Sequence, residues 1–126
     1  MLVIRDAQIE AFQREARERF ADRMVRFVAA EYPEEYQALE AAGTRRFAER
    51  AIDFGLAHGI RAEGGLLALA GLMIQYGESF ERSPDRGFAQ GILDHATLPG
   101  QLKIEILLER MASRTQGRVV VMQGDD

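Results

Sequence analysis

The chain has 126 residues, a formal net charge of -4, no cysteine, and a single lysine among its 16 basic residues. This length predicts one domain over residues 1–126 that can bury a core without disulfides or metals. The lack of cysteine excludes disulfides, thiolate metal sites and cysteine nucleophiles from this sequence. Acids and arginines alternate instead of forming a basic patch, so we expect no nucleic-acid partner.

The apolar runs are too short for a membrane span, which needs about 20 residues. The N-terminal residues reach acids and arginine too soon for a secretory signal peptide. We therefore expect a cytoplasmic protein with no membrane partner.

Residues 1–5 are a short apolar lead-in that could be a small strand or a tail, and Asp6 fits a helix N-cap. Apolar residues then recur every three or four positions, which is typical of one helix face: Ile9, Phe12, Ala16, Phe20, Met24, Phe27 and Val28. Mixed charges on the other face indicate a solvated surface. Pro33 predicts the end of this helix, because the residue before proline avoids helical geometry.

A short second helix is expected over residues 34–42, with Tyr36 and Leu39 facing inward. Four acids surround it without a basic neighbour: Glu31, Glu34, Glu35 and Glu40. Acids are favourable near a helix start, but they could also dock an arginine-bearing partner. Gly43-Thr44 then predicts a break, with Thr44 as the next N-cap.

The third helix is predicted from a stripe that its inward residues share: Phe47, Ala51, Phe54 and His58. Gly59 supplies the left-handed residue that closes a helix, and Ile60 supplies the apolar contact that accompanies such a cap.

The stretch from Gly64 to Gly77 differs from the rest of the chain, because no side chain between Gly64 and Ile74 is charged or hydrogen-bonding. A helix that is apolar on all sides must be surrounded by other elements. Gly64, Gly65 and Gly71 each cost up to about 1 kcal/mol in a helix, so we expect them to allow close approach of a neighbour. The predicted fold is all-α, a single compact bundle of about five or six helices around this buried apolar central helix.

After Gly77 a loop-rich passage contains Phe80 and Phe88, with a short helix from about Asp85 to Leu93. Pro99 is placed to begin the last helix. Its predicted buried stripe is Ile104, Leu107, Leu108 and Met111, and Gly117 is expected to end it. The apolar tail at residues 119–122 could pair as a strand with residues 1–4, dock on a partner, or join a homodimer.

No catalytic motif is recognisable, so we expect no catalytic residue, no cofactor and no metal site, and we expect that the protein is not an enzyme. His58 fits a helix-capping residue better than a ligand, because a metal site needs several convergent ligands. Asp94 and His95 resemble an acid–base pair, but no motif joins a nucleophile to them. An enzyme would instead show a polar cleft around His58, Asp94 and His95.

Residues 58–93 carry a recognisable pattern: His58-Gly59-Ile60, Glu63, Met73, Tyr76-Gly77, Phe80, Ser83-Pro84, Phe88-Ala89 and Ile92-Leu93. The pattern resembles small all-helical proteobacterial proteins that are encoded near type VI secretion spike and effector genes. Those proteins usually have polar residues where this chain has Gly64-Gly65, and tryptophan in place of Phe88. The resemblance implies a protein-binding accessory, an adaptor or chaperone that holds a secreted effector or spike component. The alternative that it implies is an immunity protein that neutralises a cognate toxin.

We expect the partner to contact Tyr36, Phe80 and Phe88, because aromatic side chains often anchor interfaces. The alternative for each is ordinary packing in the core.

Overall fold

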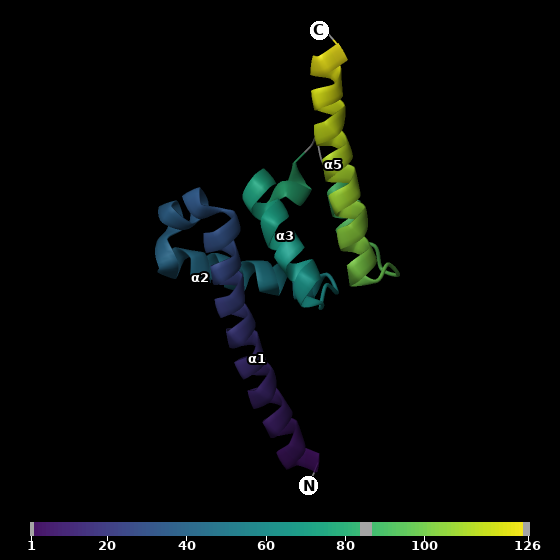
Figure 1. Ribbon diagram of the computed structural model, residues 1–126. Coiled ribbons are helices and arrows are strands. Elements are labelled where there is room, and N and C mark those ends of the chain that lie inside the picture. The colour runs from purple at the N-terminus through teal and green to yellow at the C-terminus, as the bar shows by residue number, and fades with distance from the viewer. Residues whose placement is uncertain (1, 84–86, 125–126) are drawn as a thin grey trace. The chain divides into compact units, whose positions relative to one another are not determined.

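The computed structural model describes residues 2–83 and 87–124, and the side chains of residues 13–83 and 87–112. The elements in these ranges are all helices (Figure 1): α1 (Leu2–Glu31), α2 (Pro33–Ala57), α3 (Glu63–Tyr76), the 3-10 helix η1 (Phe80–Arg82), α4 (Gly87–Leu93) and α5 (Gly100–Gly124). The predicted all-α class is confirmed. The chain forms two compact units, residues 1–53 and residues 54–126. The single-domain count stays a prediction.

The core of the first unit is formed by the apolar stripes of α1 and of α2 up to residue 53. The buried residues include Phe20, Ala21, Met24, Val28, Phe47, Ala48, Ala51 and Ile52. Their spacing of three and four residues along each helix is the one that the sequence predicts. Ion pairs between α1 and α2 flank this core and are described with the pocket below.

The start of α1 differs from the sequence expectation, whereas its end agrees. α1 already begins at Leu2, so residues 2–5 are helical and form neither the strand nor the tail that the sequence suggests. Asp6 lies inside the helix instead of capping it. Neither proline nor glycine occurs in this segment, and each residue added to an existing helix gains a hydrogen bond. α1 ends at Glu31, and Pro33 is the first residue of α2. This is a position that proline favours because its φ angle suits the first turn.

The break predicted at Gly43-Thr44 lies instead at Glu40, where φ is 63° and ψ is 176°. Gly43 is helical, and a Cβ atom there would lie 3.4 Å from Cβ of Leu39. A methyl group would make an ordinary contact there, so glycine at this position neither interrupts the helix nor is required by close packing. Thr44 does not cap a helix: it is fully buried, and its Oγ1 has no hydrogen-bond partner.

The second unit is built around α3, as the apolar stretch predicts. α3 packs against α5 and η1, and seven of its residues are buried: Gly65, Leu66, Leu69, Ala70, Gly71, Leu72 and Met73. Gly65 permits the expected close approach, since a Cβ there would lie 3.1 Å from Ile60. Gly64 is exposed with open space beside it, so the same expectation is wrong for Gly64. Gly77 ends α3 with φ of 100°.

The two C-terminal helices confirm part of the prediction. α4 ends at Leu93 as expected, and Asp85 lies outside the described residues. Pro99 precedes α5, whose buried face contains Ile104, Leu107 and Met111, whereas Leu108 is 41% exposed. α5 continues through Gly117 to Gly124, so the predicted stop at Gly117 is wrong. Of the alternatives for residues 119–122, the strand is excluded, because these residues are helical. A glycine inside a helix costs only about 1 kcal/mol, which a long helix can tolerate.

The turn after α2 is the helix cap that the sequence predicts. Gly59 has φ of 81°, and the amides of Gly59 and Ile60 donate to the carbonyls of Leu56 and Gly55 at 3.1 and 2.9 Å. These two bonds define a Schellman motif, in which glycine occupies the left-handed position. Ile60 is fully buried, as expected for the apolar contact of this cap.

The first residue of α5 touches this turn through its backbone. A Cβ atom at Gly100 would overlap the carbonyl oxygen of Gly59 and lie 2.7 Å from Cα of Ile60. We therefore expect Gly100→Ala to lower the free energy of unfolding by about 1–3 kcal/mol, because backbone atoms must move to accept the methyl group. Chemical denaturation measures this change. Gly91→Ala is the control: space beside Gly91 on α4 is open, so this variant should be about 0.4–1 kcal/mol more stable.

The kink in α2 generates a second prediction. A glutamate with positive φ is strained, and glycine adopts such angles without a Cβ clash. Glu40→Gly should raise the free energy of unfolding by about 1 kcal/mol, as measured by urea denaturation. Gln37→Gly, in a regular part of the same helix, should lower it by about 0.5–1 kcal/mol. A loss of stability in both variants would contradict the assignment of strain to Glu40.

Candidate functional site

The three aromatic residues predicted to bind a partner lie in different surroundings. Tyr36 is half-buried on α2. Phe80 is 1% exposed and belongs to the core of the second unit, as in the alternative of core packing. Phe88 is half-buried on α4, and the guanidinium carbon of Arg110 lies 5.8 Å from the centroid of its ring. Partner binding by these residues stays a prediction.

A buried lysine joins two helix ends in the second unit. Lys103 is 6% exposed, and its Nζ donates hydrogen bonds to the carbonyls of Leu93, at 2.6 Å, and His58, at 3.0 Å. Leu93 is the last residue of α4, and His58 follows the last residue of α2. Carbonyls at helix ends have no partner inside the helix and carry partial negative charge. The ammonium group therefore caps two helices at once.

We call Lys103 and the two helix ends that it joins the lysine junction. The imidazole of His58 lies beside it. Its Nδ1 is 2.9 Å from the carbonyl oxygen of Phe54, which can only accept, so Nδ1 carries a hydrogen. Its Nε2 is 3.4 Å from Oδ1 of Asp94, and Gln90 donates to Oδ2 of the same carboxylate at 2.5 Å. The structure therefore pairs Asp94 with His58. His95 is exposed, and its Nδ1 accepts from the amide of Thr97 at 3.3 Å.

This arrangement explains the helix-capping interpretation of His58. The Nδ1 hydrogen satisfies a carbonyl in the last turn of α2, and the ring lies 4.6 Å from the ring of Phe54 between centroids. His58 and Asp94 thus lie next to the two carbonyls that Lys103 binds, where the ends of α2 and α4 meet the start of α5. Of the three residues considered for an acid–base site, the structure brings together His58 and Asp94 but not His95.

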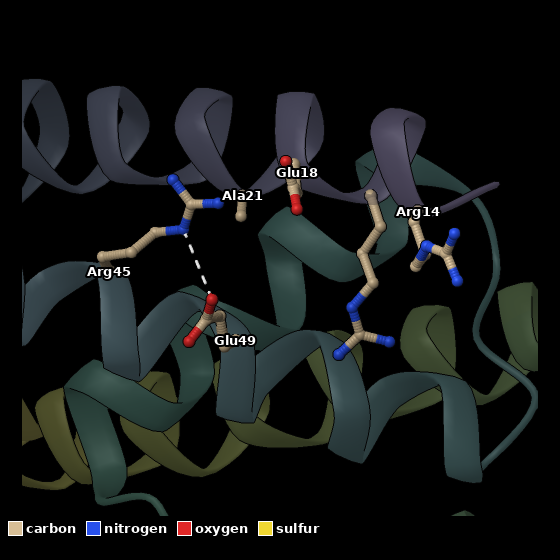
Figure 2. A pocket seen from close by; sticks show the side chains of 6 residues that line it. Arg14, Glu18, Ala21, Arg45 and Glu49 are labelled. Atoms are coloured by element: carbon tan, nitrogen blue, oxygen red, sulfur yellow. Dashed lines mark ion pairs between the residues drawn. The ribbon is translucent and has the colours of Figure 1, made fainter. Parts of the chain in front are cut away.

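A pocket of about 230 Å³ lies between α1 and α2 in the first unit (Figure 2). Its lining is charged except for one alanine: Arg14, Arg17, Glu18, Ala21, Arg45 and Glu49. In Figure 2, Glu18 projects from α1 toward α2, while Arg45 and Glu49 project from α2. No feature of the sequence singled out this pocket, because its residues belong to charge runs that also occur on ordinary solvated helices.

Two ion pairs that cross between α1 and α2 border the pocket. Arg17 of α1 pairs with Asp53 of α2, and Arg45 of α2 pairs with Asp22 of α1. Arg45 is also 3.6 Å from Glu49, although its buried Nε has no hydrogen-bond partner. Each exposed pair contributes only about 0.2–1 kcal/mol, but two pairs across one helix–helix contact fix the alignment of these side chains.

A second buried ionisable residue lies in η1. Glu81 is 7% exposed, its Oε1 has no hydrogen-bond partner, and its Oε2 is 3.9 Å from Nε of Arg82. The sequence does not indicate this burial, because Glu81 stands among polar loop residues. Lys103 was detectable in principle: it is the only lysine, and it lies four residues before Leu107 on the buried stripe of α5.

Within the described ranges, no three His, Cys, Asp or Glu side chains gather as metal ligands would. In the same part of the chain, no helix is both long and apolar enough to cross a bilayer. No protein-family model, no curated protein and no solved structure matches this chain.

The lysine junction leads to a direct test. Lys103→Met should lower the free energy of unfolding by about 2–4 kcal/mol, because two carbonyls at helix ends lose their donor while the side-chain volume is nearly kept. Thermal and urea denaturation measure the loss. Glu105→Met, at an exposed position of α5, should change stability by less than about 0.5 kcal/mol. Equal stability of the Lys103 variant and the wild type would refute the capping role.

Proposed function

We propose that this protein is a non-enzymatic binding accessory, an adaptor or chaperone for a secreted effector or spike component of a type VI secretion system. The support is the resemblance of residues 58–93 to small helical proteins encoded beside such genes. An accessory of this kind needs a rigid helical frame and an exposed anchor, and it needs no reaction centre.

The observation that carries the proposal is the pair formed by Phe88 and Arg110. Phe88 is half-buried on α4, and the guanidinium of Arg110 on α5 lies over its ring at 5.8 Å. Arginine and aromatic residues dominate the energetics of protein interfaces, because they combine a large apolar area with directional polar groups. Phe88 also occupies the position where the similar proteins usually have tryptophan, the residue most enriched in such anchors.

An immunity protein is the second candidate. The acidic residues around the start of α2, Glu31, Glu34 and Glu40, are exposed and could meet a basic surface on a toxin. The two candidates differ in consequence, since an immunity protein blocks the activity of its toxin, whereas an adaptor releases an active effector.

Affinity purification from the native host, followed by mass spectrometry, tests the proposal. We expect an effector or spike component to co-purify with the wild type. Phe88→Ala should weaken this binding by at least about tenfold, because truncating an aromatic anchor typically costs 2 kcal/mol or more. Leu102→Ala, at an exposed apolar position of α5, should bind as the wild type does. If no secretion component co-purifies, the adaptor proposal fails, and toxin inhibition by the purified chain would favour the immunity role.

A further inference from the structure

The 3-10 helix η1 places two dissimilar side chains in the interior of the second unit. Phe80 is 1% exposed, and Glu81, the next residue, is 7% exposed. η1 contacts both α3 and α4, so the phenyl ring belongs to the apolar core of this unit. A buried carboxylate requires hydrogen bonds that replace its hydration. The two neighbours therefore act in opposite directions on the stability of this segment.

The carboxylate of Glu81 receives little compensation inside the protein. Among the described residues, no group donates a hydrogen bond to its Oε1. Its Oε2 lies 3.9 Å from Nε of Arg82, which is beyond hydrogen-bond distance. The Arg82 side chain is 79% exposed, so water screens this ion pair. A buried polar group in this situation carries unfavourable free energy that is released when the group reaches solvent.

The backbone bonds that close η1 are local. In the described part of the chain, three of them run within this segment: Phe80 to Gly77 at 3.1 Å, Arg82 to Ser79 at 2.9 Å, and Ser83 to Phe80 at 3.2 Å. Each joins residues three apart, so all of them can break while α3 and α4 keep their own hydrogen bonds. Segments of this kind open at a lower free energy than core helices do.

We propose that η1 is a latch that opens separately from the surrounding helices and uncovers Phe80, and that burial of the Glu81 carboxylate keeps the free energy of opening low. In the closed state the phenyl ring fills the core. In the open state Glu81 regains its hydration, and the ring is available to a partner. Opening is a property of the chain alone, whereas use of Phe80 by an effector or spike component rests on the proposed function.

Amide hydrogen exchange of the full chain, followed by NMR, tests the latch. After correction for intrinsic rates, the amides of Phe80, Arg82 and Ser83 should exchange at least about tenfold faster than those of residues 69–73 in α3, because opening of η1 leaves α3 folded. Glu81→Met nearly keeps the side-chain volume and removes the buried charge, so it should slow exchange at the three η1 amides by about tenfold or more. Glu105→Met, at an exposed position of α5, is the control and should leave these rates within about threefold of the wild type.

Two results of the exchange experiment would overturn the latch. If the η1 amides are as protected as those of α3, η1 opens only when the whole unit unfolds. If Glu81→Met leaves exchange at η1 unchanged or accelerates it, the carboxylate does not favour opening. Glu81→Gln removes the charge and keeps the shape of the side chain, so it should slow exchange in the same direction and serves in place of Glu81→Met if that variant does not fold.

Binding measurements separate the latch from the proposed function. Where an effector or spike component co-purifies with the wild type, Glu81→Met should weaken its binding by about the factor by which exchange at η1 slows, because the open state is less populated. Binding unchanged by Glu81→Met would overturn the role of the latch in presenting Phe80. If no secretion component co-purifies, the proposed function fails, while exchange in the chain alone still decides whether η1 opens.

Discussion

The Lys103 ammonium group is the contact on which the second unit depends. Burying a charge is costly unless hydrogen bonds replace its hydration, and here two carbonyls at the ends of α2 and α4 replace part of that hydration. The negative ends of two helix dipoles meet the positive charge at this point. Because the two helix ends share one donor, the positions of the turn at Gly59, the end of α4 and the start of α5 are coupled. Glycine at position 100 fits this junction, since a Cβ there would overlap the carbonyl oxygen of Gly59.

The sequence predicts correctly those parts of the fold that depend on interactions between residues close together in the chain. The apolar stripes of α1 and α2, the burial of α3, the end of α1 before Pro33 and the left-handed turn at Gly59 each depend on neighbours close in the chain. The sequence misleads where one residue type can play two roles in a helix. Gly43 and Gly117 favour a break by residue type alone, yet glycine is tolerated inside a helix. In contrast, no residue preference predicts the positive φ of Glu40.

The candidate sites were harder to predict, because they form between residues far apart in the sequence. Lys103 reaches carbonyls 45 and 10 residues away, and a carbonyl acceptor has no signature in the sequence. Asp94 stands beside His95 in the chain but pairs with His58 in space. Adjacent residues on a loop can point apart, whereas the turn after α2 brings His58 to the end of α4. The pocket on α1 was hidden for another reason, since its residues have the composition of a solvated helix face.

The charged side chains of the α1–α2 pocket fall into two groups: those with an ion pair between the two helices, and those for which the described residues offer none. Arg17 and Arg45 are used within the first unit, where their ion pairs with Asp53 and Asp22 hold α1 against α2. Arg14 and Glu18 line the same pocket, and among the described residues neither side chain forms an ion pair across to α2. An i,i+4 pair of opposite charges could form within the helix at small gain, but these two side chains extend over the pocket without meeting.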